Sequence, residues 1–159
     1  MLPTNHLRAA VAGVVTVLAA GCASPTSAPV EEITRWMESH EEAPGSDIGV
    51  LQARVSPSSN APEGEEATVE ISYEQPAHVD AVSVECFGDG SVDITLLVTS
   101  TTADGVEQTS QTTAPQQPCG GPAHSIPLDA DSVTTIGVSG SGADQEGAWS
   151  AHVLGTVPG

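Results

Sequence analysis

The chain has 159 residues, a length that suits one domain with its own core rather than two. It contains 21 acidic residues and three arginines but no lysine, so its formal net charge is −18 with the histidines neutral. Such a polyanion does not bind nucleic acid by neutralising phosphates, and anionic lipid headgroups repel it. The composition therefore predicts no nucleic-acid partner. Solubility explains the charge most simply, and capture of a cationic or divalent ligand is the alternative.

The first 22 residues have the order of an export signal. A short polar start with one cation, Arg8, precedes an uncharged apolar run over residues 9–20, and small residues follow it. The apolar run is too short to span a bilayer as a helix, which takes about 20 residues. The segment 19–22, Ala-Ala-Gly-Cys, resembles the lipobox of bacterial lipoproteins, with the usual leucine one position early, at Leu18.

This resemblance implies that residues 1–21 are a lipoprotein signal peptide and that cleavage leaves Cys22 as a lipidated N-terminus. Its thiol would carry a diacylglyceryl group with acyl chains such as palmitate. Each buried methylene contributes about 0.8 kcal/mol, and one chain anchors only reversibly, so two or more chains on Cys22 hold the protein stably. We therefore expect an exported protein, lipid-anchored to the outer face of the cell membrane. The alternative is an ordinary secretory signal followed by a chance cysteine.

A tether and a short helix follow the signal. Residues 22–29 are small and include two prolines, which is typical of an extended linker. Pro29 with two glutamates behind it indicates a helix start, because proline fits the first turn and acids favour the positive end of the helix dipole. An apolar stripe predicts a short helix within 30–43, ending near His40. Such a helix is marginal alone, so we expect it to dock on its own domain.

From Ile48 onward the hydrophobic pattern switches to a period of two, which is typical of strands. A run that is almost wholly polar suits an exposed edge strand. Turn sequences at Gly88–Ser91 and Asp104–Gly105 predict two short hairpins. For residues 48–159 we therefore expect a mainly β domain, an antiparallel β-sandwich of seven or eight strands preceded by one short N-terminal helix. The expected strand runs are 50–55, 69–73, 82–86, 92–98, 106–113 (the polar run), 124–128, 133–139 and 147–154.

Cys86 and Cys119 are the cysteines that follow Cys22, and an even pair in an oxidising compartment predicts a disulfide. The chain-entropy model puts its contribution at roughly 3–4 kcal/mol. A redox role is not favoured, since there is no Cys-x-x-Cys and neither cysteine has a cationic neighbour. A strand ending in Cys86 before a Gly-x-Gly turn, a second cysteine before a short strand, and a terminal strand with tryptophan are together similar to small exported lipoproteins of actinobacteria. That resemblance covers about half of the chain and implies no activity.

Catalytic chemistry finds little support in the sequence. The histidines have no His-x-His or His-Glu-x-x-His spacing for zinc. His152 is best placed, beside Ser150 on the outward face of the last strand, but a nucleophile–base pair also needs a third, orienting group. We interpret His152 as a solvated strand histidine and expect no catalytic residue.

The acidic loops supply the main alternative. Asp129, Asp131, Asp144 and Glu146 lie at strand ends, and carboxylates are the ligands that calcium prefers. None of these segments matches the twelve-residue EF-hand pattern, so we expect no metal and no cofactor.

The sequence therefore predicts a non-catalytic module of the cell envelope, held at the membrane by the lipid on Cys22 and binding an unidentified envelope protein or ligand. The alternative is a calcium-dependent binding module, or an enzyme that uses the acidic loop residues. Carbohydrate binding on an aromatic platform is disfavoured, because core packing accounts better for the aromatic residues. Those that follow the signal are Trp36, Tyr73, Phe87 and Trp149.

Overall fold

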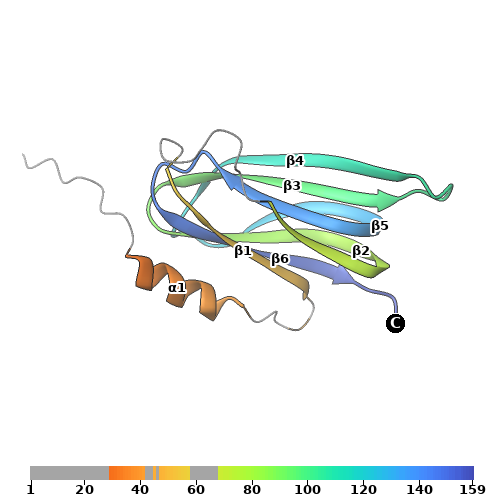
Figure 1. Ribbon diagram of the computed structural model, residues 1–159, viewed down its shortest axis with the longest axis horizontal. Coiled ribbons are helices and arrows are strands. Elements are labelled where there is room, and N and C mark those ends of the chain that lie inside the picture. Colours follow the sequence, from red (N-terminus) through yellow and green to blue (C-terminus); the bar gives the residue numbers. More distant parts are fainter. Residues whose placement is uncertain (1–28, 42–44, 46, 58–67) are drawn as a thin grey trace, which may run out of the picture.

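The computed structural model describes residues 29–41, 45, 47–57 and 68–159, so the predicted signal and lipidated Cys22 lie outside the described residues. All strand pairs are antiparallel and belong to one sheet of order β1-β6-β2-β5-β3-β4 (Figure 1). The fold is mainly β with one short helix, as predicted. The elements are α1 (Val30–Ser39), β1 (Asp47–Val55), β2 (Val69–Phe87), β3 (Ser91–Thr101), β4 (Glu107–Pro118), β5 (His124–Ser141) and β6 (Gly147–Thr156).

In two cases, a pair of expected strands forms one continuous strand. The runs at 69–73 and 82–86 both belong to β2, and the runs at 124–128 and 133–139 both belong to β5. The eight expected runs therefore make six strands in a single sheet. The structure shows six strands in one sheet and does not show the expected sandwich of seven or eight strands.

Irregular backbone replaces the loops that the sequence suggested. The pairing of β2 with β5 shifts register between Ser72 and Ala77, and Pro76, which has no N–H to pair, falls within this interval. On β5, Asp129 and Ser132 have φ angles of 49° and 54°, in the left-handed region that residues other than glycine rarely occupy. Bulges of this kind bend a strand without ending it.

The bend divides the sheet into two parts that face each other. One part holds β1, β6 and the C-terminal half of β2, and the other holds β3, β4 and the C-terminal half of β5. The two parts meet at Gly140 of β5, where an added Cβ would contact Trp149 of β6 and Val55 of β1. The hydrophobic core lies between them.

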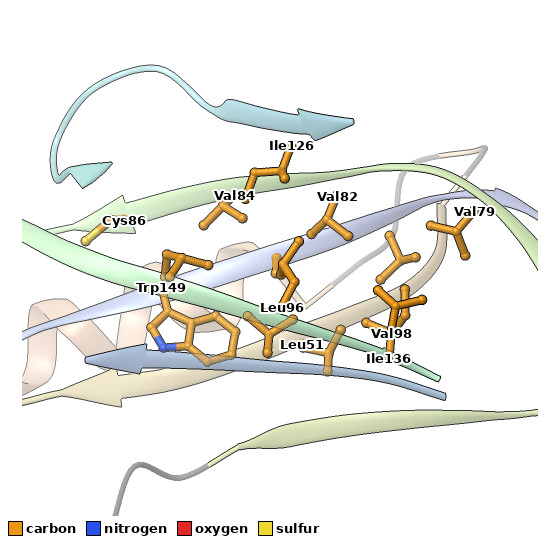
Figure 2. Close-up of a cluster of buried hydrophobic side chains, with 14 of the residues drawn as sticks. Leu51, Val79, Val82, Val84, Cys86, Leu96, Val98, Ile126, Ile136 and Trp149 are labelled. Atoms are coloured by element: carbon orange, nitrogen blue, oxygen red, sulfur yellow. The ribbon is translucent and has the colours of Figure 1, made fainter. Parts of the chain in front are cut away.

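Alternating apolar side chains fill this space, as the period of two predicted. Figure 2 shows the Trp149 indole among aliphatic side chains from several strands. Fully burying one of these aliphatic side chains contributes about 1.5–3 kcal/mol. Within the described residues, the Trp149 Nε1 and the Tyr73 hydroxyl have no hydrogen-bond partner. Burial raises the pKa of Tyr73 to about 12. The largest fully buried apolar side chains include Leu51, Ile94, Leu96, Ile136 and Trp149.

One of the two predicted hairpins is confirmed. Thr101 lies opposite Glu107 across the turn at Asp104–Gly105, so β3 and β4 form a hairpin. The turn at Gly88–Ser91 instead joins β2 to β3, which are not neighbours in the sheet, and the hairpin expected there is wrong. Strand β4 forms one edge of the sheet and is largely exposed, as predicted for the polar run.

Cys86 and Cys119 form the predicted disulfide, with their Cα atoms 4.4 Å apart. Two backbone hydrogen bonds flank it: the Cys119 N–H donates to the Gly90 carbonyl at 2.9 Å, and the Gly120 N–H donates to the Cys86 carbonyl at 2.8 Å. Cys86 is near the end of β2 and Cys119 directly follows β4, so the disulfide fastens the two facing parts of the sheet at one end.

Candidate functional site

Helix α1 docks on the outward face of the sheet, beside β1 and β6 and away from β4 (Figure 1). Ile33 is its one buried residue. Polar contacts also hold the helix on the sheet. Gln52 Nε2 donates to the Met37 carbonyl at 3.2 Å, and the Arg54 guanidinium donates to the Thr34 hydroxyl. The predicted docking of this helix on its own domain is confirmed.

Two hollows lie next to each other where α1 meets the sheet, and they share Ser39. We call them together the α1 groove. Their volumes, about 340 and 360 Å³, fall in the lower part of the range for ligand pockets, roughly 300–1,000 Å³. The first, of about 340 Å³, is lined by Ser39, His40, Asp47, Ser83, Glu85, His152 and Leu154. The second, of about 360 Å³, is lined by Glu32, Arg35, Trp36, Ser39 and Phe87.

His40 closes the C-terminus of α1 and fastens it to the sheet. Its Nε2 lies 3.0 Å from Glu85 Oε2 on β2, and its Nδ1 lies 2.8 Å from the Trp36 carbonyl oxygen. Both partners are hydrogen-bond acceptors, and the ring tautomer decides which nitrogen donates. The imidazole also lies against the Trp36 indole, with the ring centroids 4.3 Å apart and the ring planes tilted by 32°.

His152 forms part of a chain of hydrogen bonds beneath α1. Its Nδ1 lies 2.9 Å from Asp47 Oδ2, and its Nε2 lies 3.4 Å from Ser150 Oγ, which accepts from Gln52 Nε2 at 3.3 Å. The Asp47 side chain is 4% exposed and that of His152 is 14% exposed. The interpretation of His152 as a solvated histidine is therefore wrong, because Asp47 at the start of β1 pairs with it under partial cover.

The order Ser150, His152, Asp47 is that of a nucleophile, a base and an orienting carboxylate. Ser150 is completely buried, however, and other residues form the lining of the groove. A nucleophile has to reach its substrate, and this hydroxyl is sealed between the sheet and α1. The chain of hydrogen bonds instead satisfies the polar groups that docking of the helix buries.

The predicted acidic residues of β5 gather around a histidine. His78 Nδ1 lies 2.7 Å from Asp131 Oδ1, and its Nε2 lies 3.1 Å from Asp80 Oδ1 and 4.0 Å from Asp129 Oδ1. The hydrogen bond to Asp131, with a smaller contribution from Asp80, raises the pKa of His78. These carboxylates therefore pair with His78, and the bond between His78 and Asp131 holds the bend of β5 against β2.

The other predicted acidic residues lie elsewhere. Asp144 accepts from the Ser91 N–H at 2.9 Å, at the start of β3, whereas the bend of β5 lies near Ser100 at the far end of that strand. The four candidates Asp129, Asp131, Asp144 and Glu146 therefore do not form one site. Within the part of the chain that the structure describes, no three His, Cys, Asp or Glu side chains are arranged to hold a metal ion.

The aromatic residues divide between two roles. Trp149 belongs to the core, as expected. Trp36 and Phe87 are only half-buried and line the α1 groove, with ring centroids 5.6 Å apart and ring planes 26° from parallel. Core packing was the wrong expectation for these two, because a helix residue and a strand-end residue escape the alternation that directs side chains inward.

No family model, curated protein or solved structure matches the chain. None of the helices among the described residues has the length and apolar character needed to cross a membrane. What the protein does is therefore inferred from the chemistry of the α1 groove and from the N-terminal sequence.

Proposed function

We propose that this protein is an extracytoplasmic lipoprotein, anchored to the outer face of the cell membrane through Cys22, and that its β domain is a non-catalytic binding module. The α1 groove is its ligand site. One observation carries the proposal: two aromatic rings and two histidine–carboxylate pairs converge on one hollow surface outside the core. Binding pockets typically combine an apolar lining with a few placed polar groups in this way.

Two features of the chain support the extracytoplasmic location. The lipobox-like segment places a thiol where the lipid would be attached. The Cys86–Cys119 disulfide suits an oxidising compartment outside the cytoplasm. Because a net charge of −18 is repelled by anionic headgroups, the lipid on Cys22 would do the anchoring.

The groove itself supports binding rather than catalysis. Glu85 and Asp47, two acidic groups that line it, each pair with a histidine that lines it too. The serine that completes a triad-like order, Ser150, is closed off beneath α1. A site of this kind offers hydrogen bonds and aromatic surface, and the serine of the triad-like order lies out of reach of a ligand.

Anchoring is tested by membrane fractionation of cells that express the full chain. We expect wild-type protein in the membrane fraction with a diacylglyceryl group on its N-terminal peptide, and Cys22→Ser in the soluble or secreted fraction. An unmodified Cys22 thiol, or cleavage at another position, would overturn the anchoring.

Binding is tested in intact cells with a photocrosslinking amino acid at Ser39, which borders both hollows. The matched control carries the same group at Gln111, an exposed residue of the edge strand β4. We expect Ser39 alone to label a defined envelope component. Equal labelling from both positions, or from Gln111 alone, would contradict the groove as the site.

A further inference from the structure

We propose that the α1 groove binds a neutral oligosaccharide, with one sugar ring packed against the exposed parts of Trp36 and Phe87 and its hydroxyls bonded to the carboxylate of Glu85. The inference rests on the proposed function, since it names the ligand class of the same groove. It assigns Trp36, Phe87 and Glu85 as specificity-determining residues.

The aromatic part of the groove suits the apolar face of a sugar ring. A pyranose presents C–H groups on its faces and hydroxyls around its rim, so it pairs with a flat ring whose surroundings are polar. Trp36 lies against Phe87, with ring centroids 5.6 Å apart, and against His40, with ring centroids 4.3 Å apart. The parts of Trp36 and Phe87 that stay exposed line the groove. Indole rings supply large apolar contact area with little loss of side-chain freedom.

The polar part of the groove suits the hydroxyls. A carboxylate has about four lone-pair sites, so the bond that Glu85 Oε2 accepts from His40 leaves further acceptor capacity. The hydroxyls of Ser39 and Ser83 line the same hollow and can both donate and accept. A fixed carboxylate beside an aromatic ring can therefore orient the rim of a bound sugar.

The charge arrangement favours a neutral ligand over a cation. Glu85 already bonds to His40 and Asp47 already bonds to His152, so neither carboxylate needs a cation to supply its first hydrogen-bond donor. In the second hollow, Arg35 lies together with Glu32, so charges of both signs are present there. Sugar hydroxyls add to these bonds without displacing either histidine.

The two hollows also match an extended ligand. They share Ser39, and their volumes of about 340 and 360 Å³ are similar. An oligosaccharide with one ring at Trp36 in one hollow would extend toward His152 in the other. We therefore expect an oligosaccharide of two or more rings to bind more tightly than a monosaccharide.

Tryptophan fluorescence provides a direct test. The chain has two tryptophans, Trp36 and Trp149, and Trp149 is completely buried in the core, so a ligand in the groove changes the emission of Trp36. The probes are maltotriose, chitotriose and mannotriose, with trilysine as a cationic comparison. We expect a saturable change in emission with at least one trisaccharide and none with trilysine.

Variants assign the binding to named residues, with calorimetry measuring the affinity. Trp36→Ala is expected to weaken trisaccharide binding about tenfold, the effect of losing one aromatic contact. Glu85→Gln, which changes one carboxylate and keeps the side-chain size, is expected to weaken it severalfold. Glu107→Gln on the exposed strand β4 is the control and should bind as the wild type does. Trp149 emission shows whether each variant is folded.

Three outcomes would overturn the inference: no response to any of the three trisaccharides, unchanged affinity in a folded Trp36→Ala variant, or binding of trilysine in preference to the sugars. Crosslinking from Ser39 separates this failure from failure of the proposed function. If Ser39 still captures a defined envelope component, the groove remains a binding site and only the ligand class is wrong.

Discussion

The backbone of Gly140 on β5 lies directly against the indole ring of Trp149 on β6, and this contact joins the two facing parts of the sheet. A Cβ at Gly140 would overlap the indole Nε1 and would lie 3.0 Å from Val55 Cγ1. Because Trp149 is fully enclosed, it has no room to move aside. We expect Gly140→Ala to lower the free energy of unfolding by about 1–3 kcal/mol.

Urea denaturation followed by tryptophan fluorescence measures this change. Gly121→Ala is the matched control, because a Cβ there meets only the Pro118 carbonyl oxygen at 3.9 Å. A Gly140→Ala protein as stable as Gly121→Ala would show that the two parts of the sheet do not meet at this contact.

The Cys86–Cys119 disulfide should contribute strongly to stability. It bridges a sequence separation of 33 residues and fastens the two parts of the sheet at one end. Replacing both cysteines by serine is expected to lower the free energy of unfolding by roughly 2–4 kcal/mol. Alkylation of the unfolded, non-reduced wild type should label neither cysteine. Labelling of both would contradict the bridge.

His78 should make stability depend on pH. Its pKa is raised in the folded state, chiefly by the hydrogen bond to Asp131, above the ordinary value of about 6.5. The stabilisation from this shift is therefore complete below about pH 6.5 and is lost as the pH rises through the folded-state pKa. We expect the wild-type free energy of unfolding to fall across this window and the fall to be smaller in His78→Gln.

Asp131→Asn checks the physical cause, since it removes the largest contribution to the shift and keeps His78. Denaturation between pH 5 and pH 9 should give it a flatter profile than the wild type, as for His78→Gln. Three superimposable profiles would contradict the role of this pair.

Calcium at millimolar concentration should change the melting temperature little beyond the effect of matched sodium chloride. Asp131 and Asp80 already bond to His78, and Asp144 bonds to the Ser91 N–H. A bound ion at a hundredfold excess over its Kd would stabilise the fold by about 2.7 kcal/mol, which is several degrees for a domain of this size. A calcium-specific rise of that size, lost when Asp129 and Asp131 are both changed to Asn, would favour the metal-dependent alternative.

The hydrophobic period located the core well, but it did not locate the ends of the strands. Val82, Val84 and Trp149 point inward as their alternation predicted. Pro76 and Asp129 have the chemistry of loop residues, yet they lie within long strands, because a bulge and a loop need the same local backbone. The partner strands decide between the two, and a sequence pattern within one segment does not show the partner.

The groove was less predictable than the core because its pairs join distant segments. Asp47 and His152 are separated by 105 positions, and His40 and Glu85 by 45. A local signal did exist on the helix: Trp36 and His40 are four positions apart, so they share a face next to charged residues. The lipidation of Cys22 stays a prediction.

Helix α1 stands in the chain between the predicted tether at 22–29 and the sheet. If Cys22 holds the membrane, any pull on the domain passes through α1 before it reaches the strands. Side-chain contacts such as His40 with Glu85 resist that pull, whereas continuous ladders of backbone hydrogen bonds hold the strands. Under load the helix would separate first, and the sheet with its disulfide would stay intact.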